Sequence, residues 1–148
     1  MHGVNQRERG IRMASPQGFI LYRIWYGKHL VYLGRTKQPL QARIRGHMFN
    51  KPMHRAIDIH NVTKIEYTML KTEADMNLYE IYFINLWHPP LNVDDKAKDD
   101  LTITLPDLQW QEFVPTKWEE WKKQLKSDDM LQWFKCKNNR IFEDNFIL

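Results

Sequence analysis

The chain has 148 residues, a single cysteine and a formal net charge of +4. This length predicts one domain with a terminal appendage, and a core large enough to fold without disulfides. Cys136 alone excludes an intrachain disulfide framework or a cysteine-based zinc site, and favours a reducing compartment. No apolar run approaches the roughly 18 residues of a membrane helix, so we expect a soluble, cytoplasmic protein.

The charge is distributed unevenly along the chain. Residues 1–57 carry 11 Lys and Arg against one acidic residue, a formal charge of +10, whereas residues 58–148 carry 11 against 17, a charge of −6. A basic first third suits a polyanion such as nucleic acid. A surface on which these charges are merely solvated is an equally good explanation from the charge alone.

The first elements predicted are a disordered arm and a β-hairpin. Residues 1–17 are polar and basic and show no apolar period. Residues 19–25 are aromatic and β-branched, which predicts a strand, and residues 29–33 return after a turn at Gly27. Alternation predicts that Ile20, Tyr22 and Ile24 share one face of the first strand, and that Leu30 and Tyr32 share a face of the partner strand.

The following elements alternate between helix and strand. Helices are predicted from Pro39 to about Phe49, over Met53–Ile59 and over Thr72–Trp87, and a strand over 62–70. Residues 93–106 read as a linker. The Trp-rich region beyond it is predicted to be helical in part; packing on the core is the default, and a dimer or DNA contact is the alternative.

Glu80 breaks the pattern of its helix. It lies on the same face as Met76, Phe83 and Ile84, where a carboxylate without a partner is costly. This placement marks a candidate functional residue. A satisfied salt bridge, or an edge position that reaches water, explains it equally well.

Arg43 and His47 flank the apolar stripe of the first helix. They are four residues apart and therefore project from one side. The guanidinium of Arg43 suits a phosphate oxygen. A surface arginine with a solvated histidine is the simpler explanation when this pair is taken alone, just as Tyr22 and Tyr32 taken alone are ordinary packing residues of a hairpin.

Order and spacing give these residues a common meaning. Ile20-Leu21-Tyr22 is followed by Tyr32-Leu33-Gly34, and then by Arg35, Arg43, His47, Glu80 and Asn92. This series closely resembles the GIY-YIG nuclease family over about residues 18–95. It departs from the family at Ile20, where glycine is typical, and at Leu21 and Leu33, which replace isoleucine conservatively.

The resemblance implies an α+β fold, with a small, mainly antiparallel three-stranded sheet flanked by helices, over residues 18–95. Residues 1–17 form a basic arm and residues 96–148 a C-terminal extension in this scheme. It implies a DNA endonuclease of restriction, repair or mobile-element (phage) type. One Mg²⁺ or Mn²⁺ is the implied metal, without a small-molecule cofactor or a membrane, and a homodimer is one option.

The resemblance also implies roles for particular residues. Catalytic roles fall on Tyr22, Tyr32, Arg43, His47 and Glu80, with Glu80 as the metal ligand; DNA contacts fall on Arg35, Lys37, Arg45 and His54; structural roles fall on Gly34 and Asn92. Either tyrosine is a candidate proton acceptor.

Two other functions stay open at the level of the sequence. A non-catalytic nucleic-acid-binding or regulatory protein on the same fold is favoured by Ile20, whose bulk lies near a site tyrosine. A protein–protein inhibitor that uses the Trp-rich region is the other. A zinc site from His47, His54 and His60 fits no common spacing.

Overall fold

The computed structural model describes residues 15–50, 57–92 and 99–125. Most of the predicted arm, the start of the helix predicted from Met53, and the end of the C-terminal extension, with Cys136, lie outside these residues. Within the described part, no helix is long and apolar enough to cross a membrane.

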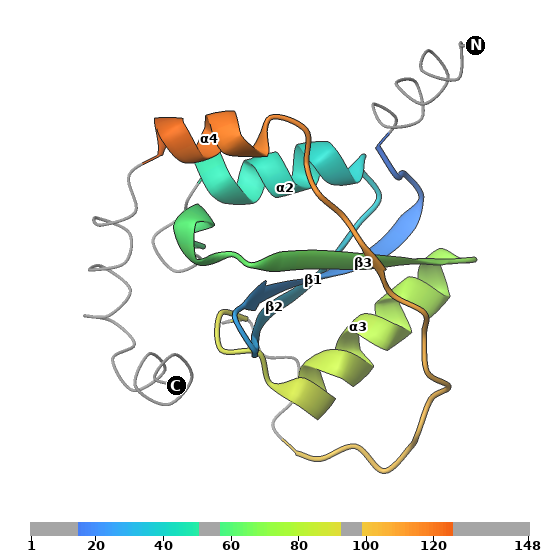
Figure 1. Cartoon of the computed structure of the whole chain (residues 1–148). Helices are drawn as coiled ribbons and strands as arrows, with labels where there is room; N and C mark the ends of the chain where they lie inside the picture. Colours follow the sequence, from blue (N-terminus) through green and yellow to red (C-terminus); the bar gives the residue numbers. More distant parts are fainter. Residues whose placement is uncertain (1–14, 51–56, 93–98, 126–148) are drawn as a thin grey trace.

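The centre of the molecule is an antiparallel sheet in the order β2-β1-β3-β4. Its strands are β1 (Phe19–Tyr26), β2 (His29–Thr36), β3 (Lys64–Leu70) and the two-residue β4 (Gln111–Glu112). Helix α2 (Leu40–Phe49) covers one face and α3 (Glu73–Trp87) covers the other (Figure 1). The predicted α+β class and the order β1, β2, α2, β3, α3 are confirmed, and the short strand β4 adds a fourth strand.

The α2 face holds the larger core. Leu40, Ile44 and Met48 are fully buried against β1, as their i, i+4, i+8 spacing predicts. From β1, Ile20 and Ile24 point into the same cluster. The α2 side of the sheet is therefore closed along the length of the helix.

A β-bulge changes the predicted alternation of β2. Ile24 pairs with Tyr32, but Trp25 pairs with Leu30, so Val31 is the extra residue. Val31 and Tyr32 both join the α2-side core, whereas Leu30 lies beside Trp25 and Trp87 on the other side. The prediction that Leu30 and Tyr32 share a face is wrong for this reason.

Helix α3 begins and ends as its sequence predicts. The hydroxyl of Thr72 accepts a hydrogen bond from the Asp75 backbone N–H at 3.0 Å. At the other end His88 takes the left-handed conformation (φ 47°), and Pro89 follows. The helix predicted over Met53–Ile59 is wrong in its described part: Ile57 and Asp58 are not helical, and Ile59–Asn61 form only a short 3-10 helix (η2).

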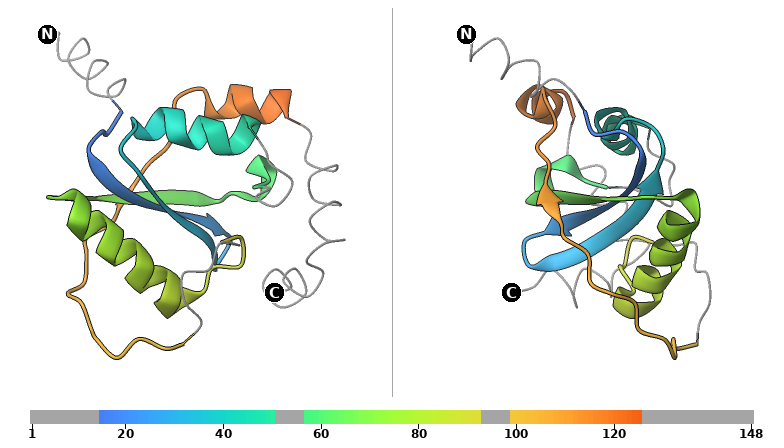
Figure 2. Two further views of the ribbon diagram at one scale, coloured as in Figure 1. Left: turned by 180° about the vertical axis from the view of Figure 1, so that it is seen from behind. Right: turned by 90° about the vertical axis from the view of Figure 1, so that its right-hand side faces the viewer.

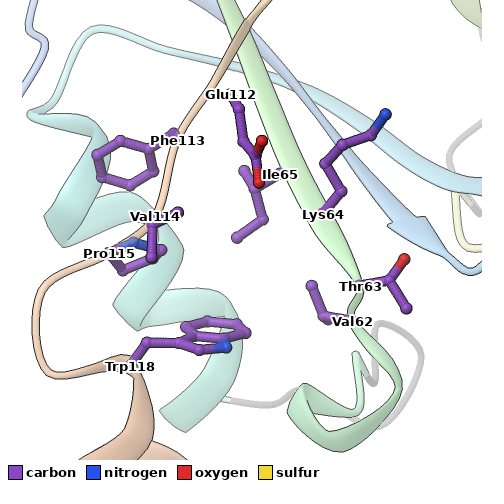
Figure 3. A pocket seen from close by; sticks show the side chains of 9 residues that line it. All are labelled: Val62, Thr63, Lys64, Ile65, Glu112, Phe113, Val114, Pro115 and Trp118. Atoms are coloured by element: carbon purple, nitrogen blue, oxygen red, sulfur yellow. The ribbon is translucent and has the colours of Figure 1, made fainter.

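The described part of the C-terminal extension runs across the outer edge of the sheet (Figure 2). Leu101 and Leu105, in the predicted linker, pack against the α3-side core, and α4 (Trp118–Gln124) places Trp121 in the α2-side core. A cavity of about 50 Å³ remains between β3 and this segment, with Ile65 and Trp118 on its walls (Figure 3). It is far smaller than a ligand pocket, which supports a packing role for this segment.

Candidate active site

Tyr22 is the centre of a polar cluster between β1 and α2. Its hydroxyl oxygen accepts a hydrogen bond from Nε of Arg43 at 3.0 Å and lies 2.6 Å from Nε2 of His47. Arg43 and His47 come from successive turns of α2, so a single tyrosine hydroxyl meets both. We call Tyr22, Tyr32, Arg43 and His47 the tyrosine cluster.

Tyr32 completes this cluster from β2. Its ring packs edge-on against His47, with centroids 4.8 Å apart, and lies 6.1 Å from the ring of Tyr22. Tyr22 is fully buried, while Tyr32 keeps a small exposed fraction of 6%. Solvent therefore reaches the cluster more readily at Tyr32 than at Tyr22.

Burial and neighbouring charge shift the pKa values of Tyr22 and Arg43. Burial is the main cause that raises the pKa of Tyr22 far above its usual value of 10.0, and Arg43 opposes it. The interaction with Tyr22 raises the pKa of Arg43 further above its ordinary value. At neutral pH the cluster thus contains a protonated Tyr22 beside a charged guanidinium.

Gly34 makes room for this arrangement. It pairs with Tyr22 across the β1–β2 ladder. A Cβ on Gly34 would lie 2.6 Å from the Tyr22 hydroxyl oxygen and 2.8 Å from Cε2 of Tyr32. Only glycine allows both rings to close over β2 at this point.

Glu80 lies on the other side of the sheet. Oε1 of its carboxylate is 3.1 Å from Nε of Arg35, and its side chain is 12% exposed. Arg35 also donates a hydrogen bond to the Asn77 side chain, one turn earlier on α3. Glu80 therefore combines both alternatives from the sequence, since it is ion-paired and stands at the edge of the buried face.

The edge strand β2 connects the tyrosine cluster with the Arg35–Glu80 ion pair. Gly34 belongs to the tyrosine-cluster side, whereas the next residue, Arg35, points to the α3 side. With β2 at the end of the sheet order, both groups lie at one margin of the molecule. The tyrosine cluster and the Arg35–Glu80 ion pair therefore lie on opposite sides of β2, next to Gly34.

The donor set at Glu80 fits one kind of metal. The described residues contain no group of three or more His, Cys, Asp or Glu side chains that could hold an ion. A single carboxylate suits Mg²⁺ or Mn²⁺, which keep several waters and complete their coordination with substrate phosphate oxygens. It does not suit the closed protein cages of structural zinc.

Asn92 fastens the loop after α3 to β2. Its Oδ1 accepts from the Leu33 N–H at 2.9 Å and its Nδ2 donates to the Leu33 carbonyl at 2.8 Å. The Leu91 N–H also donates to the Val31 carbonyl. Asn92 thereby occupies the open edge of β2 beside Gly34, a structural contact of the kind the resemblance implies.

The remaining predicted DNA contacts, Lys37, Arg45 and His54, do not belong to the tyrosine cluster or to the Arg35–Glu80 ion pair. Lys37 forms an exposed ion pair with Glu73 at 3.1 Å, and Arg45 is exposed on α2 with its guanidinium over the Phe49 ring. His54 lies outside the described residues. Asn77 was missed by sequence reasoning, although its place three residues before Glu80 on one helix was a usable signal.

Ile20 lies well inside the core. Its side chain is fully buried, in the same apolar cluster as Leu40 and Ile44 of α2. The residue that differs most from the family pattern therefore adds apolar packing below Tyr22 and contributes no surface at the margin of β2.

No family model and no curated protein sequence matches the chain. Among solved structures, the chain is similar to the GIY-YIG N-terminal endonuclease domain of UvrC from Thermotoga maritima bound to magnesium. The identity is 19% and the TM-score 0.47, over 60% of this chain and 98% of that one. A tyrosine-to-phenylalanine point mutant of the same domain, bound to its divalent cation, matches with 18% identity, the same TM-score and the same coverage.

Proposed function

We propose that this protein is a DNA endonuclease that hydrolyses phosphodiester bonds with one divalent metal ion. The observation that carries the proposal is the Tyr22–Arg43–His47 network, formed by residues in the order and spacing of GIY-YIG motifs. The close approach of Gly34 to Tyr22 and the position of Glu80 beside Arg35 of β2 also support the proposal.

Arg43 is the group best placed to bind the scissile phosphate. Its Nε is held by Tyr22, which orients the guanidinium. A guanidinium offers five N–H donors, so the terminal nitrogens can bind phosphate oxygens while Nε stays with Tyr22. Charge-assisted hydrogen bonds of this kind stabilise the extra negative charge of the transition state.

The two tyrosines have different environments and, in this proposal, different roles. Tyr22 is fully buried with a raised pKa, so it positions Arg43 and His47 and keeps its own proton. Tyr32 has the more accessible position and would contact the attacking water. In the tautomer that carries its proton on Nδ1, His47 accepts a hydrogen bond at Nε2 from the Tyr22 hydroxyl, so Tyr22 donates to His47 without losing its proton.

Glu80 would hold the metal ion, with Arg35 and Asn77 beside it. When bound, Mg²⁺ or Mn²⁺ supplies Lewis-acid stabilisation of the negative charge on the leaving oxygen. The Arg35 guanidinium already neutralises part of the Glu80 charge, so it must share the carboxylate or turn toward the DNA phosphate. Lys37 and Arg45 add positive charge on the exposed surface for the flanking duplex.

One observation favours the second candidate, a catalytically inactive nucleic-acid-binding protein on the same fold. The Arg35–Glu80 ion pair supplies the carboxylate with a cation of the protein's own, which makes a metal dispensable for charge balance. This candidate predicts salt-dependent DNA binding that is indifferent to Mg²⁺ and EDTA. The restriction, repair or mobile-element role, the homodimer and the cytoplasmic location stay predictions under either candidate.

Incubation of the full chain with supercoiled plasmid in Mg²⁺, Mn²⁺ or EDTA tests the proposal. We expect nicked and linear products with either metal, none with EDTA, and none from Glu80→Ala. The matched control is Glu73→Ala, which removes an exposed carboxylate from the same helix and should leave cleavage intact. The second candidate would be supported if the folded protein binds DNA but cleaves none of three substrates: plasmid, branched DNA and single-stranded DNA.

A further inference from the structure

The β1–β2 turn and the C-terminal end of α3 lie at the same end of the molecule (Figure 1). A second pocket lies there, away from the tyrosine cluster. It is open to solvent and has a volume of about 400 Å³. Trp25 and Trp87 contribute aromatic walls, and Lys28, His29 and His88 contribute basic groups. We call it the hairpin pocket.

The two indole rings of the hairpin pocket are held in place by their neighbours. Nε1 of Trp25 donates to Oε1 of Glu66 at 2.9 Å, which fixes the ring plane. Trp87 stacks on Phe83 with centroids 4.2 Å apart. The Arg23 guanidinium lies 5.3 Å from the Trp25 ring centroid and 5.4 Å from that of Trp87. Lys64 Nζ also lies 5.2 Å from the Trp25 ring centroid. Both indole rings are therefore fixed in position before a ligand binds.

The electrostatics of the hairpin pocket favour an anion. None of the described residues that line it is acidic. The charge of Arg23 is balanced by Glu66 at 2.7 Å, but Lys28 is exposed at the turn between β1 and β2. A ligand that is flat and aromatic at one end and anionic at the other matches both kinds of wall.

His88 reaches the pocket from an unusual backbone conformation. It has φ 47° at the C-terminus of α3, a position where glycine is favoured. A non-glycine residue there costs stability, and such residues concentrate at functional sites. The His88 imidazole thus lines the pocket from a backbone conformation that costs stability.

The hairpin pocket also lies in line with Glu80. Trp87 follows Glu80 by two turns on the same side of α3, which corresponds to about 10 Å along the helix. This is the rise of about three nucleotides in a stacked, B-form strand. An unstacked strand is longer per nucleotide, so a strand with its phosphate at Glu80 reaches the pocket within about three nucleotides.

We propose that the hairpin pocket binds an unpaired nucleotide of the DNA, within about three nucleotides of the phosphate held at Glu80. The base contacts Trp25 and Trp87, and its phosphate contacts Lys28 and His88. A base inside a duplex is stacked on its neighbours and cannot enter, so the pocket favours DNA with a flap, overhang or open end. The polymer identity of this ligand rests on the proposed nuclease function; the pocket chemistry stands on the residues named.

Equilibrium binding of the full chain, in EDTA and at fixed salt, tests this inference without any cleavage. The probes are a fluorescent DNA hairpin with a blunt end and the same hairpin with a three-thymidine overhang, in both polarities. We expect one overhang form to bind about tenfold more tightly than the blunt form. The double variant Lys28→Ala/His88→Gly should bind both forms equally while its melting temperature stays level or rises, because glycine suits the His88 backbone.

Lys117→Gly is the matched control. Lys117 is also exposed with a positive φ (67°), but it precedes α4 and does not line the pocket. It should keep the preference for the overhang. Equal affinity of wild type for both probes, loss of the preference in Lys117→Gly, or competition by free thymidine monophosphate as strong as by the overhang would each overturn the inference.

This experiment and the plasmid assay fail independently of each other. Plasmid cleavage without any overhang preference would contradict nucleotide binding at the hairpin pocket and would still support the proposed nuclease activity. An overhang preference without cleavage would support the pocket in a non-catalytic binding protein.

Discussion

Gly34 and Tyr22 face each other across the β1–β2 ladder, and the missing Cβ of Gly34 is the space that the Tyr22 hydroxyl end occupies. The glycine of one motif thus exists to let the tyrosine of the other reach Arg43 and His47. The two motifs therefore depend on each other: the first contributes the Tyr22 hydroxyl, and the second contributes a glycine small enough to leave space for it.

Gly34→Ala should therefore displace Tyr22 and damage both fold and activity. The new Cβ would meet the hydroxyl oxygen at 2.6 Å and Cζ at 2.7 Å, and the buried ring has no free space to move into. We expect a loss of about 1–3 kcal/mol in the free energy of unfolding, measured by urea denaturation. Gly46→Ala is the control: its Cβ would have ordinary contacts in α2, so the same change should be neutral or stabilising. Equal losses in the two variants would contradict the account.

Arg43→Lys should lower turnover strongly although it keeps the positive charge. Lysine cannot hold the Tyr22 hydroxyl with one nitrogen and a phosphate with others. We expect a loss of about 100-fold or more in the single-turnover rate at saturating DNA. Arg45→Lys, on the exposed side of the same helix, should change mainly DNA affinity and its salt dependence. A loss confined to affinity in Arg43→Lys would make Arg43 an ordinary phosphate contact.

Arg35→Gln should strengthen metal binding in the absence of DNA. The guanidinium at 3.1 Å competes with a metal ion for the Glu80 carboxylate, and glutamine removes that competition. Titration with Mn²⁺, followed by electron paramagnetic resonance, should show a several-fold lower dissociation constant than in wild type. Lys37→Gln, which loses an exposed ion pair to Glu73, serves as control. Weaker Mn²⁺ binding in Arg35→Gln would show that Arg35 supports the site.

Tyr26 should make the fold sensitive to alkaline pH. Burial raises its pKa above the ordinary value of 10.0, and its hydroxyl oxygen accepts a hydrogen bond from the Asp58 N–H. The unfolded chain therefore loses this proton first, so the stabilisation is complete below about pH 10 and is lost as the pH rises above it. The pKa of Tyr22 is also raised by burial, so Tyr22 contributes the same kind of pH dependence to wild type and to a Tyr26 variant.

Tyr26→Phe should accordingly be less stable than wild type at pH 7 and show a flatter decline above pH 10. The difference in slope should approach about 1.4 kcal/mol per pH unit, measured by urea denaturation at several pH values. Parallel declines for the two proteins would mean that Tyr26 ionises as easily in the fold as outside it.

The helices α2 and α3 could be predicted from local sequence. The Leu40, Ile44 and Met48 spacing was enough to orient α2, and Thr72 and Pro89 marked the ends of α3. These features depend on neighbours within a few residues, where helical geometry and capping rules apply directly.

Long-range pairings were not predictable in the same way. The bulge at Val31 moved Leu30 to the other side of the sheet, and polar Gln111 and Glu112 gave no strand signal before they paired with β3. At the site, the contact of Arg43 and His47 with one hydroxyl required the α2–β1 packing, although their common side of the helix was visible. The Arg35–Glu80 pair required the docking of α3 on β2, which no local pattern describes.

The most direct measurement is the single-turnover cleavage rate of a labelled DNA duplex by wild type and Glu80→Gln, with Mg²⁺ and with EDTA, at protein concentrations that saturate binding. Glutamine keeps the size of the side chain and removes the carboxylate charge. The account predicts Mg²⁺-dependent cleavage by wild type, a loss of at least about 100-fold in Glu80→Gln, and unchanged DNA affinity. Equal cleavage by both proteins, or no cleavage by folded wild type that binds the duplex, would contradict it.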